Sequence, residues 1–177
     1  MGIMKSTTLV PLLLLFLTVY CGTDTKQVAR NSDDTKLSLV TSFESYVQSV
    51  WNEKNMDSLK IITTENFVRK LNGVQIAKGQ HEVAAHMNIY FKGFPNTKII
   101  VEDLIFKDNQ LFVNWTYTGT HTGTFKDVTA TGKKVNVSGH STFKFNKEGK
   151  IMQEDVYFNE LELLQQLGYT LNEPNMK

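Results

Sequence analysis

An α+β fold, in which helices pack against an antiparallel sheet, is predicted by the order of two hydrophobic patterns in this 177-residue sequence. In several segments between residues 36 and 94, apolar residues recur every three or four positions, which is the period of an amphipathic helix. After Pro95 the period becomes two, in segments rich in β-branched and aromatic residues. Helices first and consecutive strands afterwards is the order expected of an α+β domain.

The first residues differ from the rest, and residues 1–20 are expected to be a signal peptide. Lys5 is followed by an apolar run from Leu9 to Tyr20 that is too short to span a bilayer. Cys21, the only cysteine, stands where a bacterial lipoprotein signal places the residue that is lipidated. The bulky Tyr20 departs from the small residue of that pattern, so an ordinary signal peptide or an uncleaved anchor is the alternative. In each case an exported domain is expected.

The charge of the mature chain argues against a nucleic acid as partner. The sequence has 19 Lys and Arg against 18 Asp and Glu, and loss of residues 1–20 removes only Lys5, which leaves 18 against 18.

Residues 21–35 are polar and are predicted to be a flexible tether. The expected location is therefore the cell envelope, with a membrane anchor at a lipidated Cys21. A periplasmic or secreted protein is the alternative.

Three helices and one hairpin are predicted before Pro95. Apolar residues at helical spacing from Leu37 to Trp51 predict the first helix, and Asn55 is expected to cap a short second helix in "NMDSLKIIT". The Asn72-Gly73 pair predicts the turn of a hairpin in "NFVRKLNGVQIAKG". The segment "GQHEVAAHMNIYFKGF" is predicted to form the third helix.

Four strands in a meander and a final short helix are predicted after Pro95. Short turns rich in Asp, Asn and Gly permit consecutive antiparallel pairing. The predicted strands are "TKIIVEDLIFK", "QLFVNWTYTGTHTG", "KKVNVSGHSTFKFN" and "KIMQEDVYFN". The segment "ELELLQQLGYT" is predicted to be helical, so the domain is expected to span residues 36–171, with residues 172–177 as a C-terminal tail.

The second predicted strand places a histidine on the same face as large apolar residues. Alternate residues of a strand share a face, so Trp115 and Tyr117 lie with His121. Gly119 and Gly123 flank His121 on that face, and their missing side chains are expected to open a pocket there. The sequence thus predicts a small-molecule pocket walled by these residues, with simple core packing as the alternative.

The last predicted strand offers a second set of polar groups. Asp155, Tyr157 and Asn159 share one face, but both faces are of mixed character, so parity alone leaves open which one is inside. If this face lines the pocket, these residues meet His121 across a curved sheet. His140, on the third predicted strand, falls on the face opposite the apolar residues and is the weaker candidate.

Three segments carry a resemblance to a known family. The stretches "WTYTGTHTGTF", "TGKKVNVSGHSTFKF" and "EGKIMQEDVYFNELELLQQLG" occur in an order and spacing that resemble the SnoaL-like polyketide cyclase or ester cyclase group of the nuclear transport factor two-like superfamily. The resemblance covers about residues 38–169. It implies a cone-shaped fold, with N-terminal helices packed on a strongly curved antiparallel sheet that encloses a cavity. It also implies a small-molecule ligand and a homodimer or higher oligomer.

The resemblance implies acid-base chemistry of the kind used in polyketide metabolism, an intramolecular aldol closure. In the family an acidic residue on the last strand acts as acid and base, and the matching position here is Asn159, which carries no proton at pH 7. Asp155, of the same parity, is the expected substitute. His121 matches the family's "GTHTG" histidine and is expected to act as a hydrogen-bond donor or a base.

The sequence leaves three functions open. The first is an exported enzyme of the cyclase or isomerase kind, with His121, Asp155 and Asn159 as catalytic residues and Trp115, Tyr117 and Tyr157 in the ligand pocket. The second is a lipid-tethered small-molecule binding module, which Asn159 favours, and the third is a dimerisation scaffold. No cofactor is expected, and no metal site, because His81 and His86 of "HEVAAH" are five residues apart rather than four.

Overall fold

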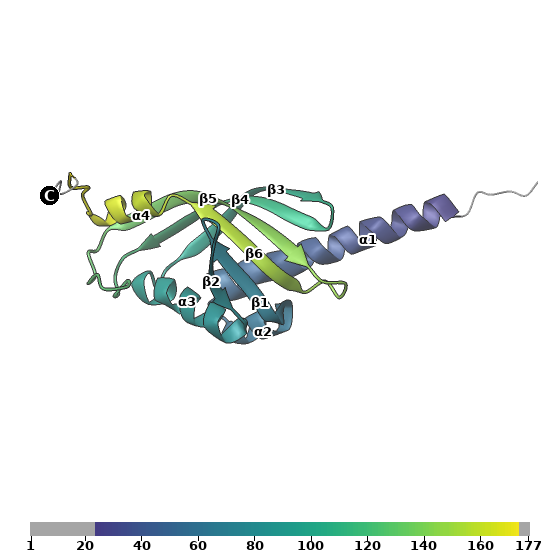
Figure 1. Cartoon of the computed structure of the whole chain (residues 1–177), viewed down its shortest axis with the longest axis horizontal. Helices are drawn as coiled ribbons and strands as arrows, with labels where there is room; N and C mark the ends of the chain where they lie inside the picture. Colours follow the sequence, from purple (N-terminus) through teal and green to yellow (C-terminus); the bar gives the residue numbers. More distant parts are fainter. Residues whose placement is uncertain (1–23, 174–177) are drawn as a thin grey trace, which may run out of the picture.

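The computed structural model describes residues 24–173 (Figure 1). The expected signal peptide (residues 1–20), the expected lipidation site Cys21 and the last four residues of the predicted tail lie outside the described residues. Within them, helices come first and four consecutive strands follow, which confirms the predicted α+β class. No helix in this described part is long and apolar enough to cross a membrane.

The first helix, α1 (Asp24–Ser45), begins earlier than the sequence predicts. A tether is predicted over residues 21–35, whereas the chain is helical from Asp24 onward. Residues 24–35 include no Gly or Pro and contain Lys, Gln, Ala and Arg, which are good helix formers. A helix already nucleated by the packing of its apolar end also extends at low cost. Figure 1 shows the start of α1 projecting from the rest of the molecule.

The predicted first helix changes its winding after Ser45. A π-helix, η1 (Tyr46–Asn52), follows α1 directly, and the Glu53 N–H donates to the carbonyl oxygen of Gln48 at 2.9 Å, five residues back. The wider π turn aligns residues four and five positions apart. Tyr46, Val50 and Trp51 are therefore buried on one side, facing the sheet.

The predicted cap and hairpin turn are both present. The Asn55 side chain accepts hydrogen bonds from the backbone N–H groups of Asp57 and Ser58, at 3.0 and 3.2 Å. Asn72 and Gly73 have positive φ values of 49° and 86°, as expected for the tight turn of a hairpin. The elements here are α2 (Met56–Ile62), β1 (Thr63–Leu71), β2 (Val74–Lys78) and α3 (Gln80–Gly93).

One six-stranded sheet, ordered β2-β1-β6-β5-β4-β3, forms the body of the fold. Strands β3 to β6 are the predicted antiparallel meander. Strand β1 joins β6 in parallel, and this pairing sets Arg69 beside Glu154. The remaining elements are β3 (Lys98–Lys107), β4 (Gln110–Thr120), β5 (Lys134–Phe145), β6 (Ile151–Phe158) and α4 (Glu160–Leu167).

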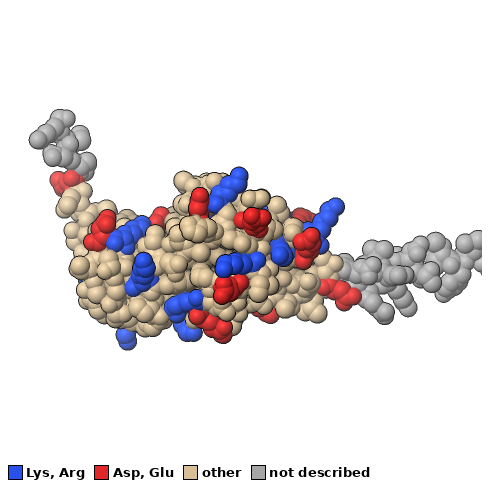
Figure 2. All heavy atoms as spheres, turned by 90° about the horizontal axis from the view of Figure 1, so that it is seen from below, with Lys and Arg blue, Asp and Glu red and all other residues tan. Residues whose placement is uncertain are grey.

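The helices cover one face of the curved sheet, and the core lies between them. Helices α2 and α3 contact β1, and α4 contacts β5 at the end of the molecule opposite the projecting α1 (Figure 1). On the face that Figure 2 displays, Lys and Arg are interspersed with Asp and Glu, and neither sign gathers into one patch. The displayed face thus offers no patch of a single charge, and the candidate site lies in the apolar interior.

Candidate functional site

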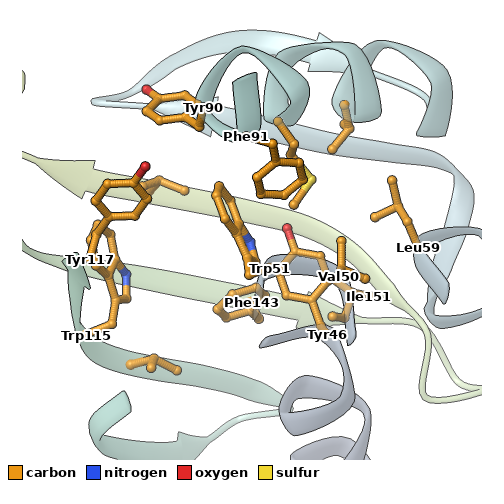
Figure 3. Close-up of a cluster of buried hydrophobic side chains, with 14 of the residues drawn as sticks. Tyr46, Val50, Trp51, Leu59, Tyr90, Phe91, Trp115, Tyr117, Phe143 and Ile151 are labelled. Atoms are coloured by element: carbon orange, nitrogen blue, oxygen red, sulfur yellow. The ribbon is translucent and has the colours of Figure 1, made fainter. Parts of the chain in front are cut away.

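A cavity lies between the helices and the concave face of the sheet. Its walls are mainly aromatic and aliphatic, and they come from α1, η1, α3, α4 and all strands except β2. Figure 3 shows Tyr46 and Trp51 on one side, Trp115 and Tyr117 on the other, and Tyr90 projecting from α3. The polar or charged side chains that line this cavity besides these aromatic residues are Arg69, His86, Ser141 and Glu154.

One end of the cavity is built on a buried ion pair. Arg69 on β1 donates through Nη1 to Oε2 of Glu154 on β6 at 2.7 Å, and the Tyr46 hydroxyl donates to the same oxygen at 2.8 Å. Arg69 and Glu154 are only 5% and 3% exposed. The guanidinium also lies over the Trp51 ring, 4.9 Å from its centroid. Arg69 Nε is also buried, and it forms no hydrogen bond within the described part of the protein. Its N–H is therefore available to donate to a ligand.

Burial controls the protonation of this ion pair. It raises the pKa of the Glu154 carboxyl, and the nearby Arg69 charge and Tyr46 hydroxyl oppose that shift only in part. Burial alone would lower the pKa of Arg69, but Glu154 and Tyr46 raise it. A carboxylate with a raised pKa in an apolar cavity is the type of group that exchanges protons with a carbon acid.

A second polar group lies on α3 and β4. His86 and Tyr90 are four residues apart on one face of α3, with ring centroids 5.5 Å apart, and Tyr90 lies 6.2 Å from the ring of Tyr117. His86 Nδ1 and the Tyr117 hydroxyl are buried and have no hydrogen-bond partner among the described residues. Burial, followed by the charges of Arg69 and Lys126, lowers the pKa of His86 to about 4. The imidazole is therefore neutral at pH 7.

The predicted pocket residues fall into two groups. Trp115 and Tyr117 line the cavity, and Trp115 Nε1 donates to the Ser141 hydroxyl at 2.9 Å. Tyr157 is 48% exposed and lies on the other face of β6. Asp155 also faces outward, where it lies 3.8 Å from Lys70 and accepts from Gln153. The face of β6 that lines the cavity carries Glu154 instead.

Asn159 caps a helix. It directly follows β6, and its side chain accepts a hydrogen bond from the backbone N–H of Glu162 at 3.1 Å, as the N-cap of α4. It does not line the cavity. The structure thus assigns Asn159 a local role at the start of α4 and gives no geometric basis for catalysis there.

His121 is buried, as its parity predicts, but it lies outside the cavity. Its ring packs against Phe94 and Phe125, and Nδ1 accepts from the Thr131 backbone N–H at 3.3 Å. The flanking glycines leave no open pocket. A Cβ at Gly119 would lie 3.0 Å from Phe94 Cβ, and one at Gly123 would lie 1.9 Å from the backbone oxygen of Lys92. These glycines allow close packing, so the expected pocket around His121 is replaced by packed core.

Three residues that the sequence analysis did not select lie in the cavity, namely Arg69, His86 and Glu154. Each carried a sequence signal. Arg69 alternates with Phe67 and Leu71, and Glu154 alternates with Val156 and Phe158, so each is a charged residue on an apolar strand face. His86 lies four residues before Tyr90 and so shares its helix face.

Comparison with known proteins identifies the fold. A solved protein from Jannaschia sp. CCS1, described as a SnoaL-like polyketide cyclase, has a TM-score of 0.69 and 18% identity, with 76% of this chain and 94% of that chain covered. A phenazine biosynthesis-related protein from Pseudomonas aeruginosa has a TM-score of 0.67 and 15% identity, with 84% and 96% covered. AclR from Streptomyces galilaeus, described as a hydroxylase, has a TM-score of 0.64 and 19% identity, with 81% and 86% covered.

Two of these descriptions name different activities, a polyketide cyclase and a hydroxylase, so the shared fold does not fix the reaction. A search of curated proteins finds no match. The family model for SnoaL-like polyketide cyclases matches residues 43–167, which include the whole cavity wall. The chain therefore belongs to the SnoaL-like polyketide cyclase family.

Proposed function

We propose that the cavity binds a small carbonyl-containing molecule and that Glu154 exchanges a proton with it, in an intramolecular aldol cyclisation or an isomerisation. One observation carries this proposal: the carboxylate of Glu154 lines an apolar cavity beside Arg69, whose Nε has no partner within the described protein. A base and a hydrogen-bond donor are thus adjacent in a buried, mainly apolar site. These are the two groups that enolate formation requires.

The chemistry begins with removal of a proton from the carbon next to a carbonyl group. The Glu154 carboxylate takes the proton, and the electron pair of the C–H bond moves to give an enolate whose charge rests on the carbonyl oxygen. Arg69 Nε donates to that oxygen. In cyclisation the enolate carbon attacks a second carbonyl of the same molecule and the new alkoxide recovers a proton from Glu154. In isomerisation the proton returns to a different carbon.

The proposal is tested by exchange of carbon-bound hydrogen in D₂O. Native mass spectrometry of protein purified from its own host first identifies any retained molecule, and 4′-fluoroacetophenone serves as a defined probe. We expect the wild type to accelerate deuterium uptake next to the carbonyl, and E154Q to lose about a hundredfold or more of that rate. D155N, which alters a carboxylate on the outer face of the same strand, should exchange like the wild type. Equal rates for E154Q and the wild type would contradict the proposal.

A second candidate function, a binding module without catalysis, is favoured by Asn159. The family's acidic residue is absent at this position, and the asparagine serves as a helix cap. A retained molecule together with no exchange above the uncatalysed rate in the wild type would support this alternative.

We also propose that the chain is exported, anchored at Cys21, and a homodimer. Export and the anchor are supported by the apolar run before Cys21. The dimer is supported by exposed apolar residues on the outer face of the sheet, Ile100, Ile105 and Tyr157, which are 54%, 64% and 48% exposed. The intact mass of the mature protein and its sedimentation in detergent would check both points. An unmodified Cys21 or a monomer would remove the corresponding proposal.

A further inference from the structure

The cavity contains a second polar cluster that the ion pair does not use. His86 Nδ1 and the Tyr117 hydroxyl are both buried, and neither forms a hydrogen bond of regular geometry among residues 24–173. The Thr97 side chain is the polar neighbour that acts on the pKa of the Tyr117 hydroxyl, which burial raises overall. Buried polar atoms without partners are uncommon in folded proteins, because each loses its hydrogen bonds to water. Both side chains line the cavity, and Tyr90 contacts both rings. A molecule in the cavity is therefore the natural partner of these two atoms.

Both groups are uncharged at neutral pH. Burial lowers the pKa of His86 to about 4 and raises the pKa of the Tyr117 hydroxyl above its ordinary value. The phenol therefore keeps its proton as a hydrogen-bond donor, and the imidazole is neutral, with one N–H to donate. Neutral donors in an apolar surrounding suit an oxygen that is neutral in the ground state and gains negative charge during reaction.

The charge of the cavity selects the class of ligand. Arg69 and Glu154 are the charged residues that line it, and they are paired with each other at 2.7 Å. Lys126, which contributes to the low pKa of His86, lies outside the lining. A charged ligand would lose its hydration without meeting an unpaired opposite charge. An uncharged ligand with polar oxygens is therefore the class that the lining of this cavity suits. The cavity has a volume of about 50 Å³, so a ligand of several heavy atoms requires the lining side chains to move apart.

We infer that His86 and Tyr117 form a second subsite, which binds an uncharged carbonyl oxygen of the ligand by donating hydrogen bonds to it. The inference rests on the proposed function, because the same cavity must hold the ligand. It adds that the substrate carries two carbonyl groups, one beside the acidic carbon at the Glu154 end and one at His86 and Tyr117. In a cyclisation the second carbonyl is the electrophile, and its oxygen becomes the alkoxide.

The test compares two probes that differ in one oxygen, 4′-fluoroacetophenone and 1-ethyl-4-fluorobenzene. The single carbonyl of the ketone binds at one end of the cavity at a time, so the variants report whether His86 and Tyr117 or Arg69 holds it in most of the bound molecules. Their affinities are measured by ¹⁹F NMR on the wild type, H86F and Y117F, which keep the aromatic packing and remove the polar atoms. We expect the wild type to bind the ketone about tenfold more tightly than the hydrocarbon, and each variant to lose about three- to tenfold of the ketone affinity. Hydrocarbon affinity should stay within about twofold.

A spectroscopic readout separates a hydrogen-bonding role from a structural one. With ¹³C at the ketone carbonyl, we expect a downfield shift on binding to the wild type and a smaller shift on binding to either variant. An unchanged ketone preference and carbonyl shift in both H86F and Y117F would overturn the inference, as would equal loss of ketone and hydrocarbon binding in variants whose thermal unfolding matches the wild type.

The control variant E154Q distinguishes this inference from the proposed function. It should lose deuterium exchange and keep the ketone preference, because its change lies at the ion-pair end. A wild type that prefers the ketone but does not accelerate exchange would reject the proposed catalysis and retain the subsite. An E154Q variant whose thermal unfolding matches the wild type but which shows no ketone preference would place the carbonyl at the ion pair and reject the subsite.

Discussion

At the scale of single residues, the buried pair of Arg69 and Glu154 serves the fold and the site together. Two successive residue pairs of β1 and β6 can be compared. Arg69 lies opposite Glu154 inside the cavity, and Lys70 lies opposite Asp155 on the outer face of the sheet. The inner contact is 2.7 Å long between nearly buried side chains, and the outer one is 3.8 Å long and partly exposed. Buried charges are costly unless they are paired, so the inner partners depend on each other.

Removal of one inner partner should therefore be far more costly than removal of one outer partner. We expect R69M to lower the free energy of unfolding by roughly 3–5 kcal/mol, because Glu154 then remains buried without its cation. K70M, the matched change in the ion pair on the outer face, should lower the free energy of unfolding by less than about 1 kcal/mol. The double variant R69M/E154L should recover most of the loss. Urea unfolding followed by tryptophan fluorescence measures all three, and similar losses for R69M and K70M would contradict the argument.

At the scale of elements, β6 shows why the site was predicted only in part. Alternation left open which face of β6 is inside, because the apolar Ile151 shares a face with Asp155 whereas the apolar Val156 shares a face with Glu154. In the structure the register shifts between Lys144 and Phe145 of the paired strand. Ile151 and Glu154 are consequently both buried although they differ in parity. A bulge of this kind reverses the facing of every residue beyond it, and nothing in the local sequence marks it. The parity of β4 is regular, so Trp115 and Tyr117 lie where alternation places them.

The start of α4 gives a prediction about Asn159. As an N-cap residue, Asn159 satisfies the backbone N–H of Glu162, so N159A should lower the free energy of unfolding by about 1 kcal/mol. Aspartate caps as well as asparagine, so N159D should be close to neutral in stability. It should also leave deuterium exchange unchanged, because position 159 lies outside the cavity. Chemical unfolding and the exchange assay measure these effects, and a large gain of exchange in N159D would show that this position reaches the ligand.

At the scale of the whole molecule, the cavity depends on a pairing between distant parts of the chain. The helices, the Asn72-Gly73 hairpin and the four-strand meander each follow from local patterns and were predicted. The parallel pairing of β1 with β6 has no local signal, yet it brings Arg69 to Glu154, 85 residues apart. The helix phase of α3 then sets His86 against the same cavity. The fold was therefore more predictable than the site, because the site is made by long-range register.

The buried histidines make the stability of the whole domain depend on pH. Burial lowers the pKa of both His86, to about 4, and His121. Below the ordinary value of about 6.5, the unfolded chain binds protons that the folded protein excludes, so the free energy of unfolding should fall as pH drops from 6.5 towards 4. Glu154, whose pKa burial raises, acts in the opposite direction.

Urea unfolding across this pH range should show a shallower pH dependence of the free energy of unfolding in H86F and H121F than in the wild type. The difference should reach up to about 1.4 kcal/mol per pH unit for each histidine. Parallel curves for the three proteins would mean that neither imidazole is held neutral by the fold.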